Sequence, residues 1–513
     1  MKGVREMRKL LTAICVMLCL TSYAQSRIDY SEMIGSGQLS EAKIKIKYEL
    51  VNNDTLSQYE VLQLKKQLGR IHVILDEYTY TYDEMFDELK KEIPNLTSED
   101  IRNWEADTSL EYHWVDGKKR YYWAFSYNLF KLNTEAKKRQ IQEEKKPKRK
   151  KKYDHIQHKL AVIEEAEKTG EVYVLPKRIK VCMTFGENIK NVPDGTIVRG
   201  WLPFPRETKK QRDIQITSMH PRSDLIFNKG KYLNASAYVE KKVQRSELEN
   251  AYWIKNLTHP PEVWRASRDR AERFVNNDYL MFQVAFEYTA YGVYRHIDET
   301  DILPYDTTLA DYQRYTREER PHLAFTASLK ALSEEIVGEE RHPYLKAKKI
   351  YAWICKNVPW TSPEYSALRC LSDDVARLQR GDCGIKAFLF VSLCRLNGIP
   401  ARLQGGWMVR PFGGHTQHGW AQMYMEPYGW MTVDPDAGSH LIDHENEQLK
   451  YFHFGNCDTY RLIIYDDTLP LFPLKIHGSQ VGTGRTGGMQ LGAFEWTGGG
   501  LENGIIIDSS AEE

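Results

Sequence analysis

The chain has 513 residues, enough for about three or four units of ordinary domain size. Hydrophobic residues make up 42% and charged residues 27%, a balance typical of a chain that folds over most of its length. The formal net charge of +1 argues against a globally basic nucleic-acid-binding protein, so we expect no nucleic-acid partner.

The first 24 residues have the layout of a secretory signal peptide. Basic residues up to Lys9 precede the apolar run 10–20, and Ser22 and Ala24 are small residues at the usual cleavage positions. The run is too short for a permanent membrane anchor, and Cys19 lacks the small preceding residue of a lipoprotein signal. We expect cleavage after Ala24 and a periplasmic or secreted protein. A buried N-terminal helix is the less favoured alternative.

Residues 25–170 are predicted to form a helical region with one hairpin and a basic linker. Thr97 and the acid at position 100 have the spacing of a helix N-cap, and Asp116-Gly117 lies between two aromatic runs as in a hairpin turn. The run 145–152 carries seven basic residues around one proline. We interpret it as a solvated linker, with a polyanion-binding strip as the alternative.

Residues 171–300 have the composition of a β-sandwich-like domain. The segments 179–185 and 280–288 are rich in strand-forming residues, and 193–205 indicates a turn, a strand and a proline-limited exit.

Helical periodicity then returns, and we expect a core domain over 301–452. One helix should begin near Pro343 and another should span 383–396, followed by strands at 404–409, 418–425 and 429–434. Residues 453–513 are expected to be a β-rich C-terminal segment with its clearest strand at 461–465. Its glycine-rich run, 482–500, does not have the order of a nucleotide site.

Cys383 lies where a predicted loop turns into a helix. Backbone N–H groups and the helix dipole at such an end favour a thiolate, which makes the sulfur nucleophilic near neutral pH. The same N–H groups can receive the oxyanion of a tetrahedral intermediate. Cys394, further along the same helix among aromatic and leucine residues, is expected to be buried. The sequence thus predicts Cys383 as the nucleophile.

His418 opens one predicted strand and Asp434 closes the next. Their midpoint is Glu426, next to turn-forming residues, so a hairpin centred there would place the two side chains opposite each other on one face. A carboxylate on one imidazole nitrogen fixes the tautomer and leaves the other nitrogen for the cysteine proton. A bulge that shifts this register is an open alternative.

The strings Gly381-Asp382-Cys383, His418-Gly-Trp and Trp430-Met-Thr-Val-Asp434-Pro, in this order, resemble the core motifs of the transglutaminase-like superfamily. The resemblance covers about 347–436. It implies an α+β fold with a papain-like core, which the sequence pattern places between β-rich domains and after the helical N-terminal region. It further implies a Cys383–His418–Asp434 triad that forms a thioester without a cofactor. Family members commonly have alanine where this chain has Gly419, a small change that we expect to leave the triad intact.

Three further residues have open interpretations. Trp360 lies where the family often places an aromatic residue near the oxyanion side, and a core position is an equal alternative. His415 and His418 could bind zinc with Cys383, but no fourth ligand is evident and a zinc-bound sulfur is not a free nucleophile, so we expect no metal. Asp436 is a weaker candidate than Asp434 for orienting the base.

Together these features predict an exported thiol enzyme that performs acyl transfer at amide bonds. We favour a peptidase or amidase acting on protein or peptide substrates, cell-envelope peptides included, because water is abundant there and no amine-acceptor site is visible in the sequence. The alternatives are a protein-glutamine gamma-glutamyltransferase and a non-catalytic envelope binding module.

Overall fold

The computed structural model describes residues 29–141, 154–222, 226–227, 236–248, 278–409, 415–467, 493–496, 499–500 and 503–511. The expected signal peptide and the basic run 145–152 lie outside these ranges. The chain divides into two compact units, the first formed by residues up to Ile141 with Glu364–Ala367 and the second by the remainder. Within the described ranges, no helix is long and apolar enough to cross a membrane.

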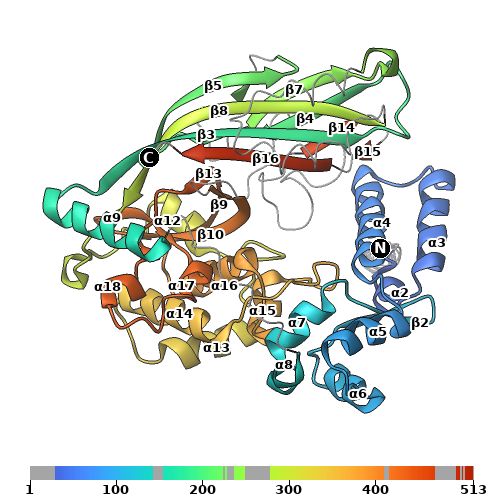
Figure 1. Ribbon diagram of the computed structural model, residues 1–513, viewed down its shortest axis with the longest axis horizontal. Helices are drawn as coiled ribbons and strands as arrows, with labels where there is room; N and C mark the ends of the chain where they lie inside the picture. Colours follow the sequence, from blue (N-terminus) through green and yellow to red (C-terminus); the bar gives the residue numbers. More distant parts are fainter. Residues whose placement is uncertain are drawn as a thin grey trace, which may run out of the picture. The chain divides into compact units, whose positions relative to one another are not determined.

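Unit 1 is helical with one small hairpin, coloured blue to cyan in Figure 1. Three of its helices begin with capping boxes, in which a Ser or Thr and an acid three residues later satisfy each other's backbone N–H groups. The N-cap predicted at Thr97 and the hairpin turn at Asp116-Gly117 are both confirmed. The elements are α2 (Ser31–Gly35), α3 (Leu39–Asn52), α4 (Gln58–Glu77), α5 (Tyr82–Glu92), α6 (Ser98–Ala106), β1 (Tyr112–Val115), β2 (Lys118–Tyr121), α7 (Phe125–Leu132) and α8 (Thr134–Arg139).

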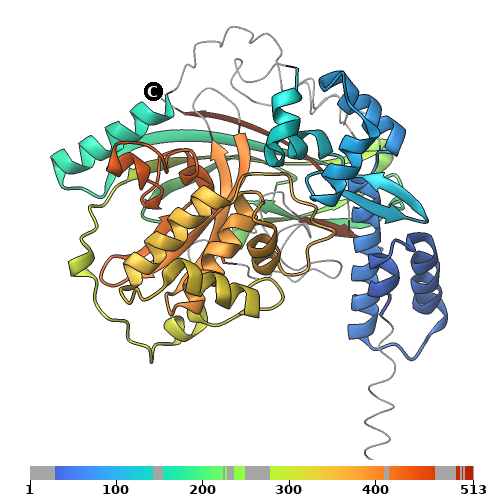
Figure 2. The same cartoon turned by 90° about the horizontal axis from the view of Figure 1, so that it is seen from below.

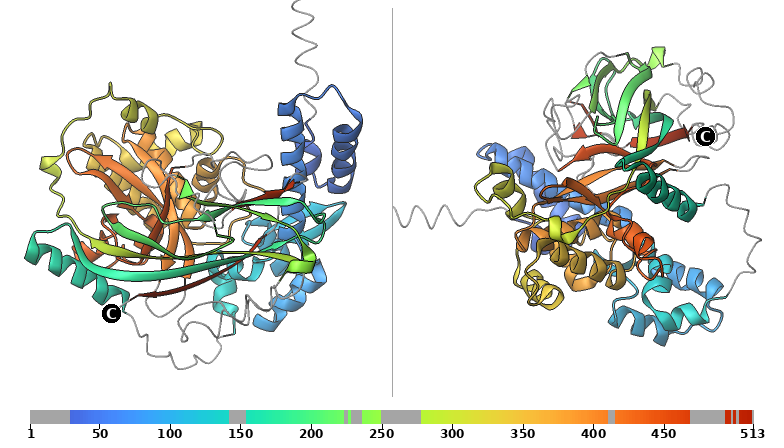
Figure 3. Two further views of the ribbon diagram at one scale, coloured as in Figure 1. Left: turned by 90° about the horizontal axis from the view of Figure 1, so that it is seen from above. Right: turned by 90° about the vertical axis from the view of Figure 1, so that its left-hand side faces the viewer.

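Unit 2 begins with α9 (His155–Thr169) and a β region of two antiparallel sheets. One sheet has the order β16-β3-β8-β5 and the other β15-β14-β4-β7-β6. Figure 3 shows the long strands of the first sheet lying side by side. The strands are β3 (Tyr173–Asn188), β4 (Ile197–Pro203), β5 (Gln211–His220), β6 (Ile226–Phe227), β7 (Ser236–Lys242), β8 (Tyr279–Val293), β14 (Ala493–Trp496), β15 (Gly499–Gly500) and β16 (Asn503–Ala511).

The C-terminal strands complete this β region. β16 runs antiparallel to β3 with Ile506 opposite Thr184, and β14 runs antiparallel to β4 with Phe494 opposite Gly200. The C-terminal segment expected from the sequence is therefore built into sheets that begin some three hundred residues earlier.

The remaining sheet of unit 2 carries the candidate chemistry and has the order β12-β11-β10-β9-β13. Figure 2 shows the yellow and orange helices of this region lying over its orange strands. Its elements are α12 (Ala310–Thr316), α13 (Ala327–Val337), α14 (Pro343–Asn357), α15 (Leu371–Leu378), α16 (Cys383–Leu396), β9 (Ala401–Val409), β10 (His415–Met425), β11 (Gly429–Val433), α17 (Pro435–Gly438), α18 (Glu447–Lys450), β12 (Phe454–Gly455) and β13 (Arg461–Asp466).

Helix α16 is the central helix of this region, and its bounds match the helix predicted from the sequence. It packs against β10 and β9, and nearly every side chain from Ile385 onward is buried, Cys394 included, as predicted. β12 and β13, which lie beyond the expected core boundary at residue 452, form the two edges of the sheet.

The opposite face of β9 and β13 shares a core with the β region, because Trp407 and Leu462 belong to the same buried cluster as Trp201 and Phe282. Unit 2 is therefore a helix layer, a central sheet and a β region. The chain has the α+β fold expected from the sequence, with helices and strands in separate layers.

Candidate active site

Cys383 is the first residue of α16, as the loop-to-helix pattern predicted. The carboxylate of Asp382 caps the helix by accepting a hydrogen bond from the N–H of Ile385, at 3.0 Å. The first N–H groups of a helix have no carbonyl one turn earlier, so those of Cys383 and Gly384 are available to a bound anion. This end of the helix can therefore stabilise both a thiolate and an oxyanion.

The structure brings the three predicted residues of the triad together. Nε2 of His418 lies 2.7 Å from Oδ2 of Asp434, and both side chains are buried. His418 also shares a hydrogen bond with the Cys383 thiol, and the N–H of Gly419 donates to Cys383 Sγ at 3.5 Å. Because Asp434 engages Nε2, Nδ1 is the ring nitrogen left to face the thiol.

The hairpin between β10 and β11 has a different register from the one predicted. Its centre was expected at Glu426, whereas Met425 pairs with Gly429, which moves the centre to Pro427. Asp434 therefore lies past the last paired residue of β11, level with Trp420 rather than with His418. The shift of two residues keeps both side chains on one face, because side chains alternate with a period of two.

Asp434 is held at both of its oxygens. Oδ1 accepts hydrogen bonds from the N–H groups of Asp436 and Ala437, at 3.1 and 2.9 Å, since Asp434 is the N-cap of α17. Oδ2 accepts from Nη1 of Arg461 as well as interacting with His418. The carboxylate is thus fixed by two backbone groups and two side chains.

Sequence reasoning missed Arg461, which it treated only as a strand residue. The guanidinium is fully buried and lies 5.3 Å from the centre of the Trp420 ring. The available signal was an Asp458-x-x-Arg461 pair directly before an apolar strand, because such charges are buried only when they are paired.

The charges of the site act on one another. Burial raises the pKa of Asp434, but His418 and Arg461 outweigh it and hold that pKa well below its ordinary value. Burial lowers the pKa of His418, but Asp434 and then Cys383 raise it well above its ordinary value. Burial raises the pKa of Cys383 above its ordinary value, and His418 opposes this rise without cancelling it. The arrangement therefore favours a protonated imidazole next to an ionised Asp434.

Trp360 lies beside the loop that carries the nucleophile. It forms a parallel bridge with Gly381, and the N–H of Thr361 donates to the carbonyl of Gly381 at 3.3 Å. With 39% of its surface exposed, Trp360 does not have the core position considered from the sequence. Its bridge partner Gly381 is two residues before Cys383, so Trp360 lies next to the loop that carries the candidate nucleophile.

The other residues considered from the sequence have different partners. Asp436 accepts a hydrogen bond from the buried Lys386 ammonium at 2.8 Å. His415 packs edge-on against the ring of Trp407. Among the described residues, no group of three or more His, Cys, Asp or Glu side chains is arranged to hold a metal ion.

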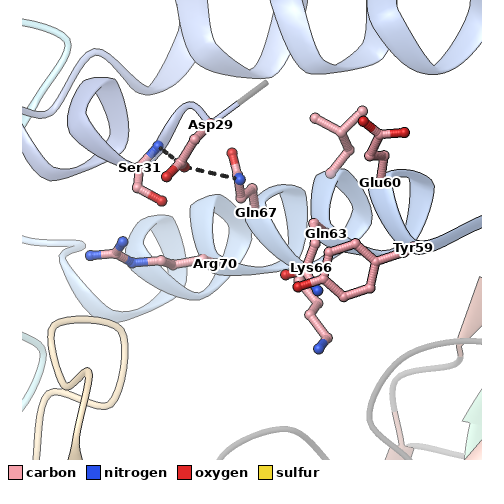
Figure 4. Close-up of a pocket in the computed structure, with 9 residues that line it drawn as sticks. Asp29, Ser31, Tyr59, Glu60, Gln63, Lys66, Gln67 and Arg70 are labelled. Atoms are coloured by element: carbon pink, nitrogen blue, oxygen red, sulfur yellow. Dashed lines mark hydrogen bonds between the residues drawn. The ribbon is translucent and has the colours of Figure 1, made fainter. Parts of the chain in front are cut away.

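A surface pocket in unit 1 offers a contrast. It is lined by polar side chains of the α4 face and the residues before α2, among them Asp29, Gln67 and Arg70 (Figure 4). Gln67 donates to Asp29 at 3.2 Å, and the backbone N–H of Ser31 donates to the same oxygen at 2.9 Å. Its lining contains neither cysteine nor histidine, so it does not offer the nucleophile and base found at α16.

Comparison with known proteins agrees with the position of this site. Residues 330–435 match the model of the Transglutaminase-like superfamily, and this segment contains all three predicted triad residues. The chain is similar to kyphoscoliosis peptidase of Homo sapiens, with 26% identity over 127 residues, which is 23% of this chain and 19% of the relative. The mouse protein (Mus musculus) is 25% identical over 137 residues, which is 25% of this chain and 21% of the relative.

The chain thus spans about a fifth of the length of these curated relatives. A crystal structure of a candidate cysteine protease from Cytophaga hutchinsonii overlaps with a TM-score of 0.42 and 13% identity, covering 66% of this chain and 92% of that one.

Proposed function

We propose that this chain, which carries a transglutaminase-like core over residues 330–435, is an exported cysteine hydrolase that cleaves amide bonds in peptides or proteins. The observation that supports it is the set of contacts at Cys383. The thiol lies at the start of α16 and shares a hydrogen bond with His418, whose Nε2 is 2.7 Å from a buried carboxylate. Such a set is what thiol acyl transfer requires.

In the proposed reaction the Cys383 thiolate attacks the carbonyl carbon of the amide. The N–H groups of the first turn of α16 receive the oxyanion, next to Trp360. The His418 imidazolium gives its proton to the nitrogen as the C–N bond breaks, which leaves a thioester and a free amine. The neutral His418 then takes a proton from water, and the hydroxide adds to the thioester. The C–S bond breaks, the carboxylic acid leaves, and the Cys383 thiolate is restored beside the His418 imidazolium. Asp434 keeps the imidazole oriented throughout.

Export forms part of the same proposal. The N-terminal 24 residues have the charge and apolar pattern of a signal peptide, and cleavage after Ala24 would leave Gln25 as the first residue. A periplasmic or secreted hydrolase would meet peptides of the cell envelope as substrates. Mass spectrometry of the protein from its own host should find Gln25 at the N-terminus, and recovery of the chain with Met1 intact would contradict export.

The activity is tested with a peptide library incubated with the full chain, with and without an added primary amine. We expect cleaved peptides that carry a new carboxyl group, and none when Cys383→Ala is used. Amine-linked products without cleavage would identify a cross-linking enzyme instead. If no product forms and Cys383 reacts with iodoacetamide at about pH 6 to 7 no faster than a buried thiol, the chain is a binding module.

A further inference from the structure

The orienting carboxylate has a charged partner from outside the segment that matches the family. Arg461 is the first residue of β13, beyond residues 330–435, and it donates to the same oxygen of Asp434 that faces His418 Nε2. Like Asp434, its side chain is fully buried, with 0% exposure. Burying a charged side chain costs free energy unless its contacts offset that cost. A buried guanidinium that contacts the orienting carboxylate is therefore a candidate for a role in the site.

We propose that Arg461 is a positioning residue of the active site, which keeps Asp434 ionised and aimed at Nε2 of His418 so that Nδ1 faces Cys383. This inference rests on the function proposed above. Arg461 would not touch the substrate. It would act through Asp434 on the proton that His418 and Cys383 share.

Arg461 is itself held in place by a second set of contacts. Its Nε donates to Oδ2 of Asp458 at 3.1 Å, and its Nη2 lies 3.4 Å from Nδ1 of His453. Burial, together with Arg461 and Lys159, lowers the pKa of His453 well below its ordinary value, so its neutral ring can accept this bond. The planar guanidinium thus contacts three different groups through three separate nitrogens. A lysine has its three donors on one nitrogen and does not reproduce this planar spread.

Other elements also present titratable groups to Asp434. They are Lys159 of α9, Tyr351 and Cys355 of α14, and His453 and Cys457 of the chain before β13. Among the described side chains, however, the two that form hydrogen bonds with the Asp434 carboxylate are His418 and Arg461. Removing Arg461 takes away a positive charge from this cluster, so protons should bind more readily and the Cys383 thiolate should form at higher pH.

The test measures the rate at which iodoacetamide alkylates Cys383 in the full chain from acid to alkaline pH, with the modified peptide identified by mass spectrometry. Arg461→Met removes the positive charge and the hydrogen bonds. Arg461→Lys keeps the positive charge but places it on a single nitrogen. Arg395→Met is the matched control. Arg395 is also buried, lies at the far end of α16, and bonds through Nε to the carbonyl of Ala401 at 2.8 Å.

We expect the midpoint of the pH profile to rise by about one unit in Arg461→Met, which is about a tenfold slower alkylation below the midpoint. Arg461→Lys should show a smaller rise, and Arg395→Met should retain the profile of the unmodified chain. The inference is overturned if the Arg461→Met profile coincides with that of the unmodified chain. If Arg461→Met fails to fold, an unchanged profile in Arg461→Lys overturns it equally. Alkylation needs no substrate, so this result is independent of whether peptide hydrolysis is found.

Discussion

Asp434 and Asp466 are both buried carboxylates of the central sheet region of unit 2, but of these two only Asp434 contacts a histidine. Asp434 is 0% exposed and Asp466 is 1% exposed, and each contacts a buried arginine. Asp434 also meets His418, which shares a hydrogen bond with Cys383. Asp466 instead contacts Arg206, Arg402 and Gln404, none of which releases a proton near neutral pH.

The difference teaches that a buried ion pair alone does not mark an active site. Both clusters satisfy their charges, and the indole of Trp420 links them by donating to Gln404 while it packs under Arg461. Asp434 contacts an imidazole that in turn contacts a thiol, so a proton can be transferred between these groups. The side chains around Asp466 keep their protons near neutral pH. The cluster around Asp434 is therefore suited to proton transfer, and the cluster around Asp466 is suited to stabilising the fold.

The largest effect is expected at the nucleophile. Cys383→Ala should abolish amide hydrolysis, a loss of at least about ten-thousandfold, because no other group at the site can form the thioester. The fold should remain, since the side chain is only partly buried and its removal leaves little cavity. Product formation by mass spectrometry and thermal unfolding by circular dichroism measure both. Full activity of this variant would exclude the proposed mechanism.

Loss of the base should be nearly as severe. His418→Ala removes the acceptor of the thiol proton and the donor to the leaving amine. Its kcat/KM should fall close to that of Cys383→Ala, and the double variant should be little worse than either, because the residues act as one unit. Independent, multiplying losses in the double variant would show that His418 acts separately from Cys383.

Asp434→Asn and Asp466→Asn should differ in which property they change, activity or stability. Asp434→Asn should lower kcat by about a hundredfold or more, since the imidazole loses its orienting charge. The charge of Asp434 raises the pKa of His418. The alkaline limb of kcat should consequently move to lower pH in Asp434→Asn, because the imidazolium then loses its proton more easily.

Asp466→Asn should instead destabilise the fold by on the order of 3 kcal/mol, because it leaves buried arginines without their counter-charge. Its pH profile should stay that of the unmodified chain. Asp436→Asn provides a second control, since that carboxylate contacts Lys386 rather than the base. A crippled Asp436→Asn beside an active Asp434→Asn would assign the orienting role to Asp436.

The smallest effect is expected where β10 crosses the first turn of α16. A Cβ added at Gly419 would lie 3.3 Å from Cα of Gly384, which is tighter than ordinary van der Waals contact. Gly419→Ala should therefore slow alkylation of Cys383 by a few-fold, because the N–H that contacts Sγ must move with the backbone. The rate of alkylation by iodoacetamide measures this effect. An unchanged rate would show that β10 and α16 accommodate the added methyl group without moving the Gly419 N–H.

Much of the local chemistry could be predicted from the chain alone. The start of α16 at Cys383 follows from a capping Asp382 and a long apolar run, which are neighbours in sequence. The placement of His418 and Asp434 on one face follows from strand alternation. The predicted register was wrong, but the shift was two residues, and an even shift leaves both side chains on the same face. The transglutaminase-like motifs lie within one continuous segment, so their order is readable without a structure.

The rest depends on pairings between distant segments. β16 closes a sheet with β3, and β13 brings Arg461 to Asp434 from beyond the expected core boundary. Strand alternation is the same for any partner, so the sequence pattern of β13 indicates a buried strand without naming its neighbour. Which strand lies beside it is decided by the core that Leu462 shares with Trp201 and Phe282. Hence the sequence by itself predicted Cys383 as the nucleophile, His418 as the base and Asp434 as the orienting carboxylate, while only the tertiary structure decided which charged side chain contacts that carboxylate.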